Sequence, residues 1–443
     1  MGKTMRLRGH AALVGTTFLL LASCNAIWGI SDADVGSAPD ASSGSGGTSG
    51  TAGAAGSQPD GGAGKDTGSG DAPVLDAQDG GADDGSLDAP EEESGSNCEG
   101  GTGDCDGDPV NGCETDTTTS PYHCGACNAA CNGFCVSSAC TAVEVIASDQ
   151  FNVPFFGGIA FNDTDVFWVS SSDSDQSAEK YRIQKCAKSL PATPTTLSTN
   201  HPWLNMIMTG SQRVYFVGTS QARILYGMAF DGTGLSQELT NVYGVSWGSN
   251  RIYYASNYST SAFLKYKDTL TSTEGTVYSK KTPDWTSESV GSSLIADGTY
   301  VTYVENSSAG YKIFVNSSAT PAVSGTKSAG RIRKEGDDLL WVEYPPTSTD
   351  NRLVKYKGAS SAEVTLSTAW GVNDVAFNYP LAFVSVKGNQ AESYAPALEV
   401  IKVTDNSKRR LRAPADLKSL EIDNGYLYFF MSQRLVRISL SVL

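Results

Sequence analysis

The stretch Val166-Phe-Trp168-Val169 is the first of seven copies of one short pattern, in which an apolar residue is followed at the next position but one by an aromatic residue and usually valine. The other copies are Val214-Tyr-Phe216-Val217, Ile252-Tyr-Tyr254-Ala255, Val301-Thr-Tyr303-Val304, Leu339-Leu-Trp341-Val342, Leu381-Ala-Phe383-Val384 and Leu427-Tyr-Phe429-Phe430. They recur every 38 to 49 residues. A period of about 40–45 residues built from strands is typical of β-propeller blades. The pattern predicts seven blades, each with one copy as its second strand.

Strand-like segments flank each copy. Gly158–Phe161 and Gly244–Trp247 precede copies as first strands, whereas Tyr181–Lys185 and Arg434–Ile438 follow copies as third strands. Apolar and polar residues alternate in these segments, as in sheets that stack face to face. The seventh blade lacks a fourth strand of its own, and the strand-like residues 142–146 lack a blade. We expect this early strand to complete the seventh blade, because ring closure hides two sheet edges.

The expected fold class is all-β, with a seven-bladed β-propeller over residues 142–443. A small disulfide-rich module over residues 98–141 and a disordered linker over residues 24–97 precede it. The linker consists almost wholly of Gly, Ser, Ala, Thr, Asp and Pro. Such a composition cannot bury enough apolar surface to offset the entropy of an ordered chain.

Charge is unevenly distributed along the chain, whose formal net charge is −16. Residues 31–97 carry a net charge of −13, and residues 98–140 carry −6. Residues 141–443 hold 28 bases and 28 acids, so the expected propeller is neutral. A neutral body offers no basic surface for phosphate, and this excludes nucleic acid as a partner. We expect the protein to act as a monomer.

Residues 1–23 have the features of an export signal peptide. A basic region, Met1–His10, is followed by the apolar stretch Ala11–Ala22, which is too short to span a bilayer. The stretch ends in Leu21-Ala22-Ser23-Cys24, which resembles the lipobox of bacterial lipoproteins. The resemblance implies that Cys24 is lipidated and anchors the mature protein in a membrane. The alternative is an ordinary secretory signal in which the cysteine stands by chance.

The residue after Cys24 is Asn25. It does not resemble the aspartate or lysine associated with retention of lipoproteins in the inner membrane. The expected location is therefore the cell envelope, as an outer-membrane lipoprotein that faces the periplasm or the cell surface.

Eight of the ten cysteines fall within 43 residues: Cys98, Cys105, Cys113, Cys124, Cys127, Cys131, Cys135 and Cys140. An even number of cysteines in a segment with few large apolar residues, behind an export signal, predicts four disulfides. The pairing cannot be deduced from the spacing. Zinc is the alternative, because Cys124 and Cys127 form a CxxC pair next to His123, but exported thiols tend to oxidise.

Alternating carboxylates in the same module suggest calcium. Asp104, Asp106, Asp108 and Glu114 supply the oxygen ligands that Ca²⁺ prefers. The loop departs from the EF-hand, because Pro109 stands where that motif has glycine and the closing acid comes one residue early. The alternative is an acidic turn held by the disulfides.

The segments Asp104–Glu114 and His123–Cys131 together resemble the Cys-rich segment of envelope lipoproteins of myxobacteria and their relatives. The resemblance covers residues 98–140. In that family the segment often precedes a β-propeller, and the molecular function is largely unassigned. It therefore implies location and fold, and little mechanism.

Aromatic residues precede several of the expected first strands. These positions border the mouth of the central channel in a propeller, and the residues are Phe156, Trp203, Tyr243, Trp285 and Trp370. Trp203, Tyr243 and Trp370 lie 12, 10 and 12 residues before the centres of their repeats, so they should occupy equivalent places in space. Exposed aromatics around a cavity suit sugar rings or peptide side chains. The alternative is that they pack between blades.

We therefore expect a non-catalytic binding protein that recognises a glycan or a peptide at the propeller mouth. The alternative is a propeller polysaccharide lyase or glycosidase, which needs a carboxylate pair or a Tyr/Arg cluster there. The candidates for such a cluster are Asp284, Glu288, Arg331, Asp374 and Asp416.

Overall fold

The computed structural model describes residues 98–443, apart from Pro109, 155–156, 172–179, Ala192, Pro202, 219–222, 259–260, 281–293, Thr299, Ser308, 345–351, Trp370 and 389–394. The signal peptide, Cys24 and the linker expected over residues 24–97 lie outside this range. Within it, the chain is built of strands together with a short 3-10 helix, η2 (Leu440–Val442). In the described residues we find no helix whose length and apolar character would let it cross a membrane.

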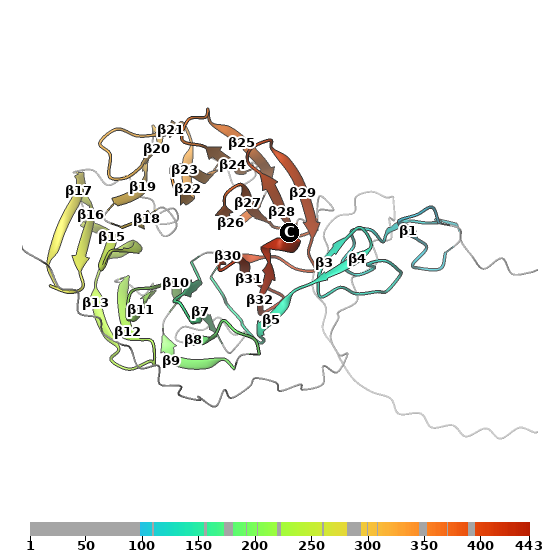
Figure 1. Ribbon diagram of the computed structural model, residues 1–443, viewed down its shortest axis with the longest axis horizontal. Helices are drawn as coiled ribbons and strands as arrows, with labels where there is room; N and C mark the ends of the chain where they lie inside the picture. Colours follow the sequence, from blue (N-terminus) through green and yellow to red (C-terminus); the bar gives the residue numbers. More distant parts are fainter. Residues whose placement is uncertain are drawn as a thin grey trace, which may run out of the picture. The chain divides into compact units, whose positions relative to one another are not determined.

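Seven four-stranded antiparallel sheets follow one another round a ring (Figure 1). Blade 1 consists of β6 (Ile159–Phe161), β7 (Asp165–Ser171), β8 (Tyr181–Ala187) and β9 (Thr195–His201). Blade 2 consists of β10 (Leu204–Thr209), β11 (Arg213–Gly218), β12 (Ile224–Ala229) and β13 (Ser236–Leu239). Blade 3 consists of β14 (Val242–Gly248), β15 (Arg251–Tyr258), β16 (Ser261–Asp268) and β17 (Glu274–Lys280). Blade 4 consists of β18 (Leu294–Asp297), β19 (Tyr300–Ser307), β20 (Gly310–Phe314) and β21 (Val323–Gly325). The predicted seven-bladed propeller is confirmed.

The remaining blades complete the ring. Blade 5 consists of β22 (Ser328–Glu335), β23 (Asp338–Tyr344), β24 (Arg352–Lys357) and β25 (Val364–Ala369). Blade 6 consists of β26 (Val372–Asn378), β27 (Leu381–Val386), β28 (Ala397–Lys402) and β29 (Ser407–Arg412). Blade 7 is β30 (Lys418–Asp423), β31 (Tyr426–Met431), β32 (Arg434–Ser439) and β5 (Glu144–Ala147).

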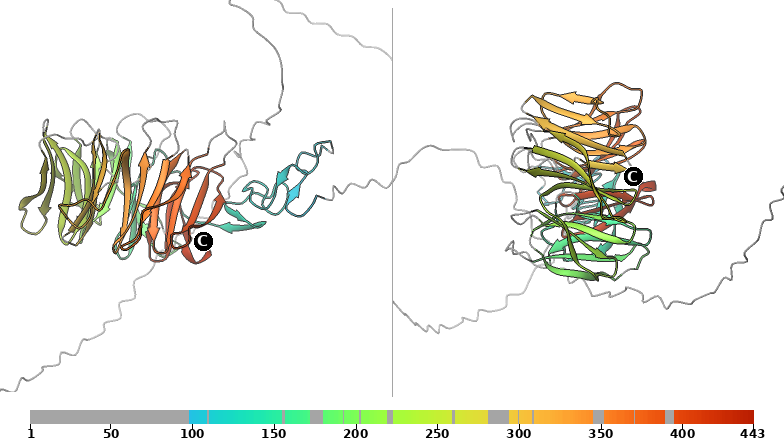
Figure 2. Two further views of the ribbon diagram at one scale, coloured as in Figure 1. Left: turned by 90° about the horizontal axis from the view of Figure 1, so that it is seen from above. Right: turned by 90° about the vertical axis from the view of Figure 1, so that its left-hand side faces the viewer.

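The strands run between the two faces of the ring, which Figure 2 shows from the side. Neighbouring strands are antiparallel, so the loop that enters each first strand lies on the same face as the turn between the second and third strands. We call this the entry face. The turns between first and second strands lie on the opposite face, where Tyr300 begins β19 and is 58% exposed.

Each repeated pattern lies in the second strand of its blade, as predicted. Val166, Phe167, Trp168 and Val169 of β7 are all fully buried, because the neighbouring blades cover both faces of the sheet. Trp168 Nε1 donates to Gln150 Oε1 at 2.8 Å, so the buried indole N–H is satisfied. The recurrent aromatic is therefore a core residue between blades.

Strand β5 is the outer strand of blade 7, although it precedes blade 1 in the chain. It pairs antiparallel with β32, with Val145 opposite Val436 and Ala147 opposite Leu435. The predicted closure is confirmed, but the strand begins at Glu144 rather than at residue 142. Glu144 is held by Arg437, whose Nε donates to Glu144 Oε2 at 2.6 Å.

The module contains β1 (Thr102–Gly103), β2 (Thr115–Asp116), β3 (Gly133–Val136) and β4 (Ala139–Ala142). Its eight cysteines form four disulfides, Cys98–Cys113, Cys105–Cys127, Cys124–Cys135 and Cys131–Cys140. The predicted number of bridges is confirmed. None of these eight sulfurs is a free thiolate, and this removes the ligands that the zinc alternative required.

An aromatic contact joins the module to blade 7. Phe134 of β3 is fully buried, and its ring centroid lies 6.0 Å from that of Phe429 in β31. Phe134 therefore belongs to the same apolar core as the second strand of the last blade. A module with few apolar residues of its own gains a core from the propeller.

Two adjacent residues of β5 provide a test of ring closure. Ile146 is 4% exposed and packs in the core between blades 7 and 1, whereas Val145 points outward and is 44% exposed. We expect Ile146→Asp to lower the free energy of unfolding by more than about 3 kcal/mol, because it buries an unpaired charge. Val145→Asp should cost less than about 1 kcal/mol. Urea unfolding followed by tryptophan fluorescence measures both, and equal losses would contradict closure by β5.

Candidate functional site

A concave site lies on the entry face where blade 7 meets blade 1. We call it the seam pocket, and its volume is about 370 Å³. Three segments line it: Gln150–Val153, which leads from β5 towards blade 1; Ala415, Asp416 and Lys418, which lead into β30; and Phe430–Gln433, at the turn between β31 and β32. A pocket of this volume is at the small end of ligand sites and accommodates one sugar ring or one amino-acid residue.

Hydrogen bonds fix the segment Gln150–Val153 across the seam. Gln150 N donates to Gln433 O at 2.8 Å, which ties the segment to blade 7. Phe151 N donates to Ser171 O at 3.1 Å, and Ser171 N donates back at 2.7 Å, which ties it to blade 1. The buried Gln150 side chain also accepts from Trp168. The segment is therefore held on both sides, with Phe151 partly exposed at the pocket.

The floor of the seam pocket is apolar. Val153, Phe430 and Met431 are each less than 10% exposed, and all three line the pocket. Phe151 adds an aromatic ring that is only partly buried. An apolar floor with a few polar groups around it is the usual composition of a small-ligand site.

Two opposite charges line the same pocket. Asp416 Oδ1 accepts a hydrogen bond from Gly388 N at 3.0 Å, which fixes the carboxylate. Burial lowers the pKa of the Lys418 ammonium; Asp416 opposes this effect and Lys387 adds to it. The charge of Lys418 is therefore influenced by one carboxylate and one further lysine.

The disulfide-rich module supports the loop that carries Asp416. Tyr122 of the module donates its hydroxyl hydrogen to Pro414 O at 2.8 Å. Two residues earlier in the chain, Arg412 Nη1 lies 3.8 Å from Oδ2 of Asp116 in the module. The module therefore contacts the chain directly before Ala415 and Asp416, and it restrains one wall of the seam pocket.

The structure describes two of the five aromatic residues that were expected to ring the propeller mouth. Trp203 is 48% exposed, and its ring centroid lies 6.0 Å from that of Tyr181, the first residue of β8. Tyr243 is partly buried beneath Arg223, which directly precedes β12 and whose guanidinium carbon lies 4.5 Å from the ring centroid. Each aromatic thus lies against the start of the third strand in the preceding blade, and neither lines the seam pocket.

The other three aromatics of the ring lie outside the described residues: Phe156, Trp285 and Trp370. Convergence of the five side chains on one cavity therefore stays a prediction.

Bulges at the start of several first strands bind neighbouring blades to one another. The register shifts in β10, β14, β22, β26 and β30. Bulged side chains donate to carbonyls of the next blade's entry segment: Arg331 Nη1 to Val372 O, Asn373 Nδ2 to Leu417 O and Ser419 Oγ to Pro154 O. A bulge re-aims a side chain out of the ladder, and here it permits these links. Arg331, a candidate for the enzyme alternative, is 6% exposed and links blades 5 and 6.

A charged cluster joins the first strands of blades 5, 6 and 7. Arg333 Nη2 lies 3.5 Å from Asp374 Oδ1 and 3.1 Å from Glu421 Oε1. Asp374 is completely buried, and its two oxygens accept from Val375 N and Leu420 N. A carboxylate so enclosed cannot contact a polymer. Asp374 and Glu421 therefore do not provide the two accessible carboxylates that a glycosidase needs.

The remaining two acids considered for an enzyme, Asp284 and Glu288, lie outside the described residues. Among the candidates that the structure describes, Asp416 lines the seam pocket.

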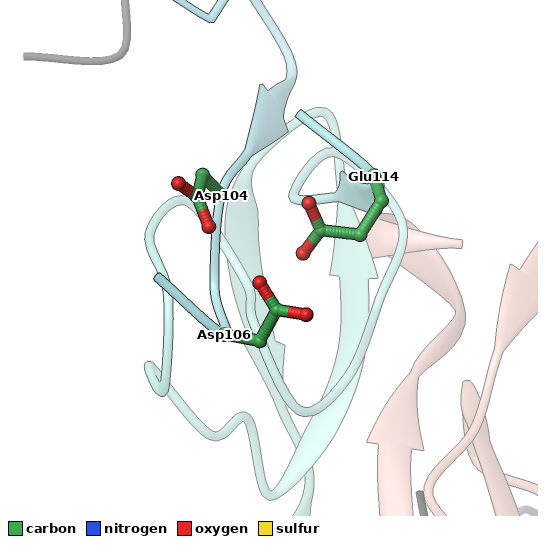
Figure 3. Close-up of side chains that lie close together, drawn as sticks. All are labelled: Asp104, Asp106 and Glu114. Carbon is green, nitrogen blue, oxygen red and sulfur yellow. The ribbon is translucent and has the colours of Figure 1, made fainter. Parts of the chain in front are cut away.

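Three of the four carboxylates expected to bind calcium are close together (Figure 3). The ligand oxygens of Asp104, Asp106 and Glu114 lie within 4.8 Å of one another. Asp108 is not part of this group, and its Oδ1 accepts from Val110 N at 2.9 Å. Oxygen donors at this spacing could hold a Ca²⁺ ion.

Loop amides already use the same carboxylates. Asp104 Oδ1 accepts from Gly107 N at 2.8 Å, and Glu114 Oε1 accepts from Cys105 N at 3.1 Å. The Asp108 amide lowers the pKa of the Asp106 carboxyl. These bonds account for the geometry of the loop without an ion, so calcium binding stays a prediction.

Comparison with known proteins assigns the chain to no family. No protein-family model matches it, and no curated protein matches it. Among solved structures it is similar to TolB from Acinetobacter baumannii, with 12% identity, a TM-score of 0.40, and coverage of 57% of this chain and 64% of the TolB chain. It thus spans less than two thirds of TolB.

Two further propellers show the same degree of likeness. The WD40 β-propeller domain of Doa1 has 13% identity and a TM-score of 0.45, with coverage of 67% of this chain and 96% of that one. A chain of the mitotic checkpoint complex has 8% identity and a TM-score of 0.48, with coverage of 68% and 93%. At these identities the likeness concerns the fold alone. The class defined here is a seven-bladed propeller with a disulfide-rich module docked on its last blade.

Phe151 and Lys418 line the seam pocket but escaped the sequence analysis. Phe151 lies far in sequence from blade 7 and reaches it only because β5 closes the ring. Lys418 has no distinctive local pattern. The available signal for Lys418 was its place in the repeat, since it lies at the start of first strand β30 as Tyr243 lies at the start of first strand β14. Phe151 precedes its first strand, β6, by eight residues and has no equivalent in the repeat.

Glu421 gives the charged cluster a measurable pH dependence. Although 28% of its side chain is accessible, burial among the first strands raises the pKa of its carboxyl to about 7, against the opposing effect of Arg333. This acid therefore favours the folded state below its ordinary pKa of 4.5, and that contribution is lost as pH rises through about 7.

We expect Glu421→Gln to raise the free energy of unfolding at pH 8 by about 1–3 kcal/mol relative to wild type, and to leave it nearly unchanged at pH 4. Urea unfolding at the two pH values measures this difference. A variant that is less stable than wild type at pH 8 would mean that the ionised Glu421 is a net stabilising partner of Arg333.

Proposed function

We propose that this protein is a non-catalytic recognition protein of the cell envelope, which binds a glycan or a peptide on the entry face of its propeller. The observation that carries the proposal is the seam pocket. It combines an apolar floor, a partly exposed aromatic ring and two charged side chains in one small concavity. Each feature suits non-covalent recognition of one residue of a larger ligand.

The proposed location rests on the cysteines and on the N-terminal sequence. Four disulfides suit an oxidising compartment outside the cytoplasm. Lipid on Cys24 would hold the propeller at a membrane, with residues 25–97 as the connection. Intact mass of the natively produced protein, with a mature chain that begins at an acylated Cys24, is the measurement for this part of the proposal.

Screening of the whole protein against arrays of glycans and peptides tests the recognition function. We expect Phe151→Ala to weaken binding of the ligand so found by at least about tenfold, since an aromatic anchor in a pocket is a typical hot spot. The matched control is Tyr300→Ala, which removes an exposed aromatic from the opposite face and should leave binding unchanged.

The same ligand discriminates the seam pocket from the expected aromatic ring. Loss of binding in Trp203→Ala with full binding in Phe151→Ala would place recognition at the ring instead. Binding that resists both changes, or loss in Tyr300→Ala alone, would overturn recognition on the entry face.

A further inference from the structure

A second concavity lies between blades 2 and 3, and it shares no lining residue with the seam pocket. We call it the rim pocket, and its volume is about 260 Å³. Its lining residues are Gln237–Thr240, in and directly after β13, together with Tyr254, Ser256, Lys265 and Glu274 from strands β15, β16 and β17 of the next blade. This volume is below the usual range of ligand sites, so an occupant is no larger than about one sugar ring.

Ser256 contributes an unpartnered hydroxyl group to the rim pocket. The residue is 4% exposed, and its Oγ makes no hydrogen bond within the part of the chain that the structure describes. A buried hydroxyl without a partner is unfavourable, because it has given up its hydrogen bonds to water. Buried polar groups in proteins are nearly always paired. An exception that lines a pocket therefore points to a hydrogen-bonding partner from outside the chain.

Two other blades show how the propeller satisfies a hydroxyl at this position of the repeat. Ser170 in blade 1 and Ser385 in blade 6 stand two residues after the repeated aromatic, as Ser256 does, and both are completely buried. Ser170 Oγ donates to Gln150 Oε1 at 2.6 Å, and Ser385 Oγ accepts from Asp374 N at 2.8 Å. Ser256 departs from this rule and lines a pocket instead.

The buried and half-buried charges at the rim pocket have partners within the chain. Glu238 Oε2 lies 2.9 Å from Lys267 Nζ, and its Oε1 lies 3.3 Å from Arg213 Nη2. The Nζ of Lys265 lies 5.2 Å from the ring centroid of Phe263, within the range of a cation–π contact. These charges do not call for a counter-ion, so a neutral ligand that donates and accepts hydrogen bonds suits the pocket.

The other lining groups combine hydrogen bonding with apolar contact. Gln237 and Thr240 are exposed side chains that can both donate and accept, and Glu274 Oε2 accepts from the Tyr254 hydroxyl at 3.0 Å. Leu239 and the Tyr254 ring are buried and belong to one apolar cluster. A pyranose ring matches this mixture, because it carries hydroxyl groups around its edge and C–H groups on its faces.

We propose that the rim pocket binds one neutral pyranose residue, with a sugar hydroxyl bonded to Ser256 Oγ and further hydroxyls bonded to Gln237 and Glu274. This is a second binding site of the propeller, and it depends neither on the seam pocket nor on the function proposed for it. The Ser256 hydroxyl can donate one hydrogen bond and accept others, so it suits either orientation of a sugar O–H. The bound sugar removes the unfavourable burial of this hydroxyl.

Simple glycosides test the proposal on the whole protein. The probes are the methyl glycosides of glucose, galactose, mannose and N-acetylglucosamine, and the comparison compounds are glycine, inorganic phosphate and N-acetylglycinamide. Titration followed by saturation-transfer difference NMR should show saturable binding of at least one glycoside, with a dissociation constant on the order of 1–10 mM for a ligand of this size. The comparison compounds should bind more weakly.

Ser256→Ala should change binding and stability in opposite directions. We expect it to weaken glycoside binding by about three- to tenfold, because one hydrogen bond is lost. It should raise the thermal midpoint of the free protein by about 1–3 °C, because it removes an unpaired buried hydroxyl.

The matched control is Ser385→Ala, at the same position of the repeat. It should lower the thermal midpoint, since Asp374 N loses its acceptor, and leave glycoside binding unchanged.

Four results would overturn the proposal. The first two are no saturable binding of any of the four glycosides, and unchanged affinity in folded Ser256→Ala. The third is a lower thermal midpoint in Ser256→Ala, which would mean that water satisfies the hydroxyl in the free protein. The fourth is tighter binding of a comparison compound through Ser256. Glycoside binding that is lost in Phe151→Ala and kept in Ser256→Ala would also contradict the rim pocket, while supporting recognition at the seam pocket.

Discussion

Pairing of β5 with β32 is the interaction on which the rest of this structure depends. Blade 7 has only three strands from its own part of the chain, and without β5 the edge of β32 would be open to other chains. The pairing also positions the two segments that flank β5 in the chain. The disulfide-rich module is brought to blade 7, where Phe134 joins the core, and Gln150–Val153 is laid across the boundary with blade 1.

The seam between blades 7 and 1 is linked in the same way as the two boundaries that precede it in the ring. Blades 5 and 6, and blades 6 and 7, are linked by bulged side chains that donate to the next blade. Ser419 makes the corresponding bond to Pro154 across the seam, directly beside the pocket-lining Val153. The seam pocket thus sits between elements that are each fixed by hydrogen bonds. A preorganised pocket of this kind loses little conformational entropy on binding.

The fold could be predicted from the sequence because its core repeats. Trp168 and Trp341 stand in the same place in two blades, and burial on both faces makes the second strand continuously apolar, which is visible without any structure. The even number and close spacing of the cysteines likewise predicted four disulfides, but the pairing of the cysteines depends on how the module folds. The pocket could not be predicted. It combines Phe151 with Lys418, and only ring closure brings residues so far apart in the chain to one site.

The central claim is that ring closure creates the recognition site at the seam, and hydrogen–deuterium exchange of the whole protein with and without its bound ligand tests this most directly. The account predicts slower amide exchange on binding in the segments that contain Gln150–Val153 and residues 415–433. It predicts no change at the turn before Tyr300 on the opposite face. Protection confined to that face, or to the first strands around Arg333, with unchanged exchange at the seam, would contradict it.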